Sequence, residues 1–257
     1  MSKPAIGYEK SAQFYDLFAN NEDLPFFLEL AENIEDFGPI LDLAAGTGRV
    51  SFALAKAGFS VWSLEKSPAM LTLATKKLNK MSSEVVERVR LIKGDMSAFA
   101  LDQKFPLIII PQSFGHCVTT DQQLACLLCI RQHLTKRGIC ALDIYQGSSF
   151  ERKSTWEDEL RVLDSKRNIK RSGTYEIDPI TQLISYQLKY EIFDDEKKIE
   201  ELEEFSHAAI IYPREANLLI RFSGFSIFAE YGGWNKVPFD HSSRIRILLL
   251  KLSSNIE

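Results

Sequence analysis

The chain has 257 residues and a net charge of −4, from 31 basic and 35 acidic side chains. Hydrophobic residues make up 45% of it and charged residues 26%, an ordinary composition for a globular protein with a large core. No apolar run approaches the roughly 20 residues that span a bilayer, and the first residues lack the apolar core of a secretory signal. Proteins that neutralise nucleic-acid phosphates usually carry a basic excess. We therefore expect a cytoplasmic protein with neither a membrane nor a nucleic-acid partner.

The first half of the chain alternates predicted strands and helices. Two helices are expected within 5–36, where Pro25 falls in a first turn and its missing N–H costs little. Strands follow at 39–44, 60–65, 89–93, 107–111 and 138–145, and helices at 50–57, 68–79 and 121–134. This alternation predicts a mainly parallel sheet with helices on both faces.

The pattern changes after about residue 147. Apolar and polar residues alternate along Ile184–Ile192, which is typical of an antiparallel strand with one face open to water. The turn signal Asp178-Pro179 precedes it. We expect 147–212 to be a small antiparallel sheet inserted into the α/β domain. The first pattern then returns, with a helix at 213–223 and strands at 225–231 and 244–252.

Cys126 and Cys129 form a CxxC, which raises the alternatives of redox chemistry or half of a zinc site. The surrounding leucines recur at helical spacing, however, and no second CxxC follows. We interpret all four cysteines as reduced core residues, which fits a cytoplasmic protein. The histidines are scattered, so no metal site is expected.

Three segments at the ends of predicted strands carry the chemistry. The first strand delivers Asp42, and the chain then turns through Gly46–Gly48 into a helix, as a close backbone approach to a ligand requires. Glu65 ends the second strand, where a carboxylate can accept both hydroxyls of a ribose. Asp95 and Met96 follow the third strand, where they could clamp an adenine. Each acid alone could equally be a solvated strand end, but ligands of open α/β sheets lie at these ends.

The segments LDLAAGTG (41–48), SLEKSP (63–68) and KGDM (93–96) resemble the class I S-adenosylmethionine-dependent methyltransferases. The resemblance implies an α/β fold with a doubly wound, mainly parallel, seven-stranded Rossmann-like sheet in the order 3-2-1-4-5-7-6. It assigns 1–146 and 213–257 to the S-adenosylmethionine-binding domain. It also makes 147–212 an inserted antiparallel β lid that covers the substrate.

The resemblance further implies S-adenosyl-L-methionine as the cofactor. The Gly46–Gly48 backbone would pack against its methionine part, with Asp42 fixing the loop and the amino group. Glu65 would take the ribose hydroxyls, and Asp95 with Met96 the adenine. The full set of expected cofactor-binding residues is Asp42, Ala44, Gly46, Gly48, Glu65, Lys66, Asp95, Met96, Pro111 and Gln112, of which the last two also lie beside the methyl acceptor.

A nicotinamide dehydrogenase is the main rival within this fold. Its fingerprint requires a third glycine, but the position three after Gly48 is Ser51. A dinucleotide also brings a pyrophosphate to a helix N-terminus, and the acid-bearing LDLAAGTG suits a zwitterionic methionine better.

The methyl acceptor is expected to be a small molecule, methylated on nitrogen or oxygen. The loop Pro111–His116 lacks the Pro-Pro motif of enzymes that methylate base or glutamine amines, and the cysteine of cytosine C5 enzymes. The segment Phe14–Phe18 is similar to the start of enzymes acting on glycine and amino sugars. Alternatives are a tRNA or protein methyltransferase and a non-catalytic cofactor-binding protein; a homodimer is an open alternative to a monomer.

His116 and Tyr15 are the candidate catalytic residues. His116 follows the fourth strand and titrates near neutral pH, so it could remove a proton from the acceptor. The resemblance puts Tyr15 over the cofactor near the methyl donor, where an aromatic face suits a sulfonium. Each residue also has a plainer interpretation, His116 as a polar loop residue and Tyr15 as a packing residue. The basic stretch 166–171 and the acidic run 194–204 are either a phosphate clamp or, as we favour, compensating solvated charges.

Overall fold

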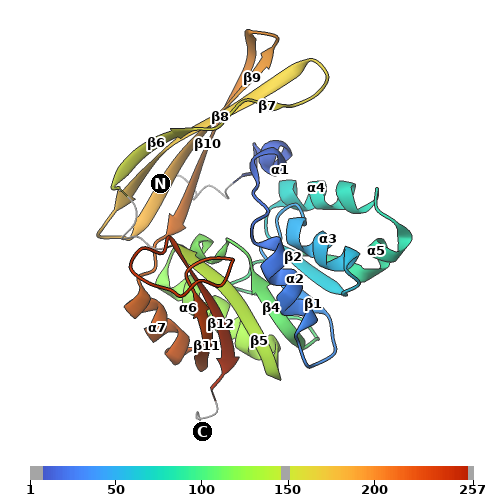
Figure 1. Cartoon of the computed structure of the whole chain (residues 1–257), viewed down its shortest axis with the longest axis vertical. Coiled ribbons are helices and arrows are strands. Elements are labelled where there is room, and N and C mark those ends of the chain that lie inside the picture. Colours follow the sequence, from blue (N-terminus) through green and yellow to red (C-terminus); the bar gives the residue numbers. More distant parts are fainter. Residues whose placement is uncertain (1–7, 146–150, 254–257) are drawn as a thin grey trace.

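The computed structural model describes residues 8–145 and 151–253, which form a main β-sheet covered by helices and a second β-sheet (Figure 1). The main sheet has seven strands in the order β11-β12-β5-β4-β1-β2-β3. Only β12 runs antiparallel to its neighbours, so the order and orientation predicted from the sequence are confirmed. Its strands are β1 (Ile40–Leu43), β2 (Val61–Glu65), β3 (Val89–Lys93), β4 (Phe105–Ile110), β5 (Leu134–Tyr145), β11 (Phe225–Tyr231) and β12 (Ile245–Leu252).

Helices cover both faces of the main sheet because its central strands are apolar on both sides. Leu41 and Leu43 of β1 join one core cluster with α6 and α7, whereas Ile40 joins the other with α2 to α5. This two-sided burial fixes the strand register, since a one-residue slip would move every side chain to the other face. The helices are α2 (Leu24–Glu32), α3 (Arg49–Lys56), α4 (Pro68–Leu78), α5 (Ser83–Arg88), α6 (Thr120–His133) and α7 (Pro213–Phe222). Within residues 8–145 and 151–253, none of the helices combines the length and the hydrophobicity that a bilayer-spanning segment needs.

Two local features differ from the sequence-based expectation. β5 begins at Leu134, directly after α6, whereas the sequence predicts a helix as far as residue 134 and a strand only from residue 138. Leu134 is buried and pairs with Phe105 across a register shift, so tertiary packing extends the strand. The short helix α5 was not expected, because it buries only Val85 and shows little apolar periodicity.

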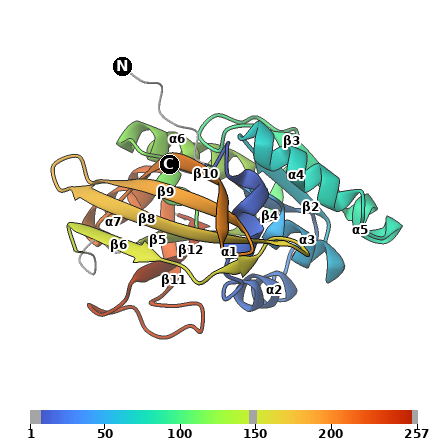
Figure 2. The ribbon, with the colours of Figure 1, turned by 90° about the horizontal axis from the view of Figure 1, so that it is seen from above.

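The second sheet is antiparallel and lies beyond the main sheet (Figure 1). Its order is β10-β9-β8-β6, and β7 pairs with β8. The alternation along Ile184–Ile192 is confirmed, because Leu188, Tyr190 and Ile192 are all buried on one face. Seen from above, the sheet lies across the main domain (Figure 2). Its strands are β6 (Lys153–Glu157), β7 (Arg161–Val162), β8 (Arg167–Asp178), β9 (Leu183–Asp194) and β10 (Lys197–Ala209).

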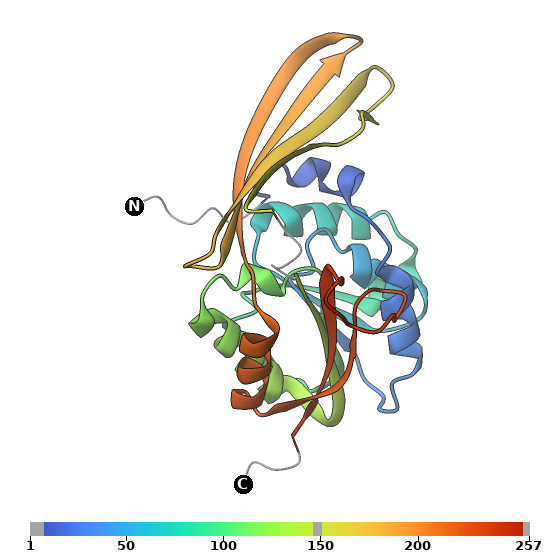
Figure 3. The same cartoon turned by 60° about the vertical axis from the view of Figure 1, so that its left-hand side comes forward.

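The segment 8–23, here called the N-terminal arm, lies between the second sheet and the main domain (Figure 3). It contains a 3-10 turn (Ala12–Phe14) and the short helix α1 (Tyr15–Phe18). The Phe14 ring packs on Tyr190 of β9, with 5.7 Å between centroids. At its start, the N–H groups of Lys10 and Ser11 donate to the carboxylate of Glu204 on β10, at 2.9 and 3.0 Å.

The cysteines, the basic residues of the second sheet and Trp234 all make contacts within the fold. Cys117, Cys126 and Cys140 are buried in the core, Cys129 packs against it, and no group of metal-binding side chains occurs within the described ranges. Basic residues of the second sheet pair with acids on its own hairpins, such as Arg171 with Asp158 and Arg167 with Asp164. Trp234 packs on Phe26 and Phe27 of α2.

The hydrogen bonds that Glu204 accepts from the arm should stabilise the arm against unfolding. Glu204→Ala leaves the buried Ser11 N–H and hydroxyl without their acceptor. An unsatisfied buried polar group costs roughly 1–3 kcal/mol. We expect urea unfolding to show a loss of about 2 kcal/mol, with trypsin cleaving earlier in the arm. The exposed neighbour Glu203→Ala is the matched control, and equal effects of the two substitutions would contradict the role given to Glu204.

Candidate active site

A cavity of about 690 Å³ opens at the carboxyl ends of the parallel strands. Its size is within the range of ligand pockets, roughly 300–1,000 Å³. One side is formed by the loops after β1, β2, β3 and β4, and the other by the arm and the ends of β9 and β10. Of the residues expected from the sequence, it is lined by Tyr15, Ala44, Gly46, Glu65, Lys66, Asp95, Met96, Gln112 and His116. Asp42, Gly48 and Pro111 are buried and do not line the cavity.

The loop after β1 takes its shape from left-handed backbone conformations. Ala44, Gly46 and Gly48 have φ angles of 55°, 59° and 84°. A Cβ on Gly48 would lie 2.4 Å from the Phe52 ring, so a larger residue there would displace the start of α3. The turn exposes the Gly46 N–H, which donates to Glu65 at 2.7 Å.

Glu65 is the carboxylate that holds two loops together. Its two oxygens accept the N–H groups of Gly46 and of Ser67, each at 2.7 Å. Burial raises the pKa of Glu65 above its usual value, although both N–H groups favour the charged form. Each carboxylate oxygen has a further lone pair, so Glu65 can still accept a ligand hydroxyl.

Asp95 and Lys66 form an ion pair at one end of the cavity, with 2.6 Å between Nζ and Oδ2. The Ser97 N–H and hydroxyl donate to the other oxygen of Asp95, at 2.9 and 2.7 Å. Burial opposes the charge, but Lys66 and Ser97 outweigh it and lower the pKa of Asp95. A charged acceptor is therefore fixed beside Met96, which also faces the cavity.

Asp42 lies beneath the loop. Its Oδ2 accepts the Ser51 hydroxyl at 2.6 Å, and Ser51 in turn accepts from Ser63 at 2.7 Å. Its Oδ1 is buried and has no hydrogen-bond partner among the residues described. Burial raises the pKa of Asp42 to about 7. In this structure Asp42 supports the loop through α3.

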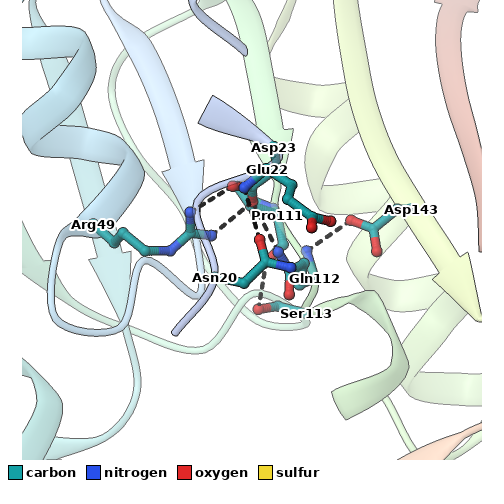
Figure 4. Close-up of polar contacts among 8 residues, drawn as sticks. All are labelled: Asn20, Glu22, Asp23, Arg49, Pro111, Gln112, Ser113 and Asp143. Atoms are coloured by element: carbon teal, nitrogen blue, oxygen red, sulfur yellow. Dashed lines mark hydrogen bonds and ion pairs between the residues drawn. The ribbon is translucent and has the colours of Figure 1, made fainter. Parts of the chain in front are cut away.

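A buried polar network that the sequence did not indicate holds the loop after β4 (Figure 4). Gln112, with φ of 51°, donates its backbone N–H to Asp143 of β5 at 2.7 Å. Its side-chain amide donates to Asp23 at 3.0 Å. Asp23 also binds both terminal nitrogens of Arg49, at 2.5 and 2.6 Å. The partners come from distant parts of the chain, and no motif links them.

Tyrosines and histidines line the side of the cavity that faces the second sheet: Tyr8, Tyr15, His116, Tyr145 and His207. The Tyr8 ring lies edge-on to both Tyr15 and His116, with centroids 5.4 and 6.5 Å away. His116 is accessible from the cavity, although protein surrounds it, and it hydrogen-bonds to the His207 backbone. Burial lowers the pKa of His116, so at neutral pH its imidazole is uncharged and can accept a proton.

The buried carboxyl of Asp143 should make the stability of the folded protein depend on pH. Burial raises its pKa from 3.8 to about 7, so the folded protein holds the proton more tightly than the unfolded chain. The contribution of Asp143 to stability therefore falls as the pH rises from about 4 to 7.

Asp143→Asn removes this titration and keeps an oxygen for the Gln112 N–H. The stability of this variant relative to wild type should increase between pH 5 and pH 8 in urea unfolding experiments. The exposed Asp102→Asn is the control and should show no such trend. A constant difference for Asp143→Asn would show that this carboxyl does not titrate in that range.

The chain is similar to known proteins both in sequence and in structure. Residues 40–138 match the methyltransferase domain family. An uncharacterised methyltransferase of Bacillus mycoides is 29% identical over 187 residues, covering 69% of this chain and 84% of that protein. The CcbJ methyltransferase from Streptomyces caelestis has a TM-score of 0.81 at 18% identity, over 99% of this chain and 100% of that one.

CalS10, an amino pentose methyltransferase from Micromonospora echinaspora solved with S-adenosylmethionine bound, has a TM-score of 0.72 at 19% identity. The match covers 97% of this chain and 99% of CalS10. At these identities the structural likeness concerns the fold, whereas the domain match includes the β1 loop, Glu65 and Asp95. The chain is an S-adenosylmethionine-dependent methyltransferase with a Rossmann-like fold.

Proposed function

We propose that this enzyme transfers the methyl group of S-adenosylmethionine to a nitrogen or oxygen of a small molecule by in-line displacement. The observation that carries the proposal is the single cavity shared by the strand-end loops and the second sheet. The cofactor would occupy the side formed by the loops. The acceptor would occupy the side lined by Tyr8, Tyr15 and His116.

The cofactor would lie across the ends of β3, β2, β1 and β4, which are neighbours in the sheet in that order. Adenine would lie beside Asp95 and Met96, and the ribose hydroxyls would donate to Glu65. The methionine part would then extend past Ala44 and Gly46 toward Gln112. Asp95 and Glu65 are both hydrogen-bond acceptors held in place by backbone N–H groups, which suits this arrangement.

The second sheet would act as the lid expected for 147–212. Ser185 and Ser206 on β9 and β10 face the same cavity as Gln112 and His116. A cover at this position excludes water and limits the size of the acceptor. The arm, held by Glu204, would close the remaining side.

Transfer breaks the bond between the methyl carbon and sulfur and forms a bond from that carbon to the acceptor atom. The electron pair stays on sulfur, giving neutral S-adenosylhomocysteine. Alignment supplies most of the catalysis. An acceptor that keeps a proton must lose it, and the uncharged His116 would take it. Tyr15 would orient the reacting groups. The likeness to CalS10, an amino pentose methyltransferase, supports a small acceptor that carries an amine.

Glu65→Ala tests the placement of the ribose. It removes a charged acceptor, and hydrogen bonds to charged groups contribute roughly 1.5–3 kcal/mol. Affinity for S-adenosylmethionine, measured by calorimetry, should fall about tenfold or more. The exposed Glu87→Ala on α5 is the control. An unchanged affinity in Glu65→Ala would rule out a ribose at this carboxylate.

His116→Ala and Tyr15→Phe test the catalytic roles. If His116 removes the proton in the transition state, kcat should fall by about 10²–10⁴, with cofactor affinity nearly unchanged. Tyr15→Phe keeps the aromatic face and removes the hydroxyl, so it separates orientation by hydrogen bonding from packing. Steady-state kinetics of both variants are the measurement. Wild-type kcat in both would leave neither residue a catalytic role.

The substrate class is tested by incubating the enzyme with methyl-labelled S-adenosylmethionine and three pools of acceptors. These are small amines and hydroxy compounds, bulk tRNA, and unfolded protein. We expect label to enter only the small-molecule pool. Label in tRNA or protein would refute the proposal, as would cofactor binding without any transfer.

A further inference from the structure

Gln112 is held between two buried carboxyls at the end of β4 (Figure 4). Asp143 fixes its backbone through the N–H, and Asp23 fixes its side chain through Nε2. Asp23 is fully buried, and Gln112 lines the cavity. The left-handed φ of 51° is rare for a residue with a side chain and persists only where the surroundings impose it.

Asp23 determines which way the carboxamide of Gln112 faces. Arg49 donates to both carboxylate oxygens of Asp23, so this carboxylate accepts hydrogen bonds from the groups around it, including Nε2 of Gln112. Only the NH₂ of Gln112 can therefore face Asp23. The amide oxygen is left as the group that Gln112 can offer to a ligand, and it is suited to an N–H donor.

The topology indicates which part of the cofactor meets this oxygen. β4 pairs directly with β1 and lies on the side of β1 away from β2 and β3. A cofactor with its adenine at Asp95 and its ribose at Glu65 thus reaches Gln112 with its amino-acid end. That end carries an ammonium group, which is a triple donor.

We propose that Asp23 is a positioning residue for the amino-acid end of the cofactor, acting through the carboxamide of Gln112. The inference rests on the proposed function. Arg49 extends the effect, because it is the first residue of α3 and directly follows the glycine turn. The Asp23 carboxylate thereby fixes the loop after β1 and the loop after β4 relative to each other, and these loops would contact the methionine part of the cofactor.

The test compares two ligands that differ in this end alone. S-Adenosylhomocysteine has the amino-acid end, whereas 5′-methylthioadenosine has the same adenine and ribose without it. Asp23→Asn keeps the size of the side chain but removes the charge that orients Gln112. Calorimetry should show affinity for S-adenosylhomocysteine falling about tenfold, with affinity for methylthioadenosine changing less than twofold. Glu22→Gln, which alters the exposed adjacent carboxylate, should change neither.

If Asp23→Asn fails to fold, Gln112→Asn tests the same positioning role. Asparagine tolerates the left-handed conformation but is one methylene shorter, so it cannot reach both Asp23 and the ligand. It should also weaken S-adenosylhomocysteine selectively. Equal losses for both ligands, or none, in the folded variant would overturn the inference. If the wild-type protein binds neither ligand, the proposed cofactor site fails instead.

Discussion

The active-site architecture depends on burying several carboxyl groups at one edge of a parallel sheet. Asp23, Asp42, Glu65 and Asp143 are all buried there. A buried charge is costly unless it is paired or hydrogen-bonded. Asp23 accepts hydrogen bonds from the guanidinium of Arg49, and Glu65 accepts them from two backbone N–H groups. These hydrogen bonds and the ion pair tie the loops to one another and give the cavity a defined shape.

The carboxyls differ in how they are satisfied, and this separates their roles. Glu65 and Asp95 face the cavity while backbone N–H groups hold them, so they are prepared to accept further donors. Asp42 and Asp143 lie behind the lining, and burial raises the pKa of each to about 7. Asp42 accepts the Ser51 hydroxyl and Asp143 accepts the Gln112 N–H, so both carboxyls hold the loops without facing the cavity. This distinction explains why acids that look equivalent in the sequence are expected to act differently.

The sequence predicted the parts of the fold that depend on local pattern. Strand periodicity and glycine turns located β1 to β4, and the alternation along Ile184–Ile192 located a half-buried strand. The order of the main sheet came from the resemblance to a known family. The strand-end acids Glu65 and Asp95 were found because a parallel sheet brings such ends to one edge.

The hydrogen bonds that hold the site together could not be predicted from local sequence pattern, because the residues that form them meet only in the folded protein. Arg49 and Asp23 are 26 residues apart, Gln112 and Asp23 are 89 apart, and Ser11 and Glu204 are 193 apart. Asp23 precedes a helix and could be taken for a capping residue, but its side chain makes no cap hydrogen bond. Burial likewise changes the chemistry of His116, whose lowered pKa depends on the protein around it.

A crystal structure of the protein with S-adenosylhomocysteine bound would test this arrangement of the cofactor. We expect adenine beside Asp95 and Met96, ribose hydroxyls on Glu65, and the amino-acid end at Gln112 with its ammonium on the amide oxygen. The sulfur should face the part of the cavity that Tyr15 and His116 line. A ribose away from Glu65, or an amino-acid end that does not reach Gln112, would contradict it.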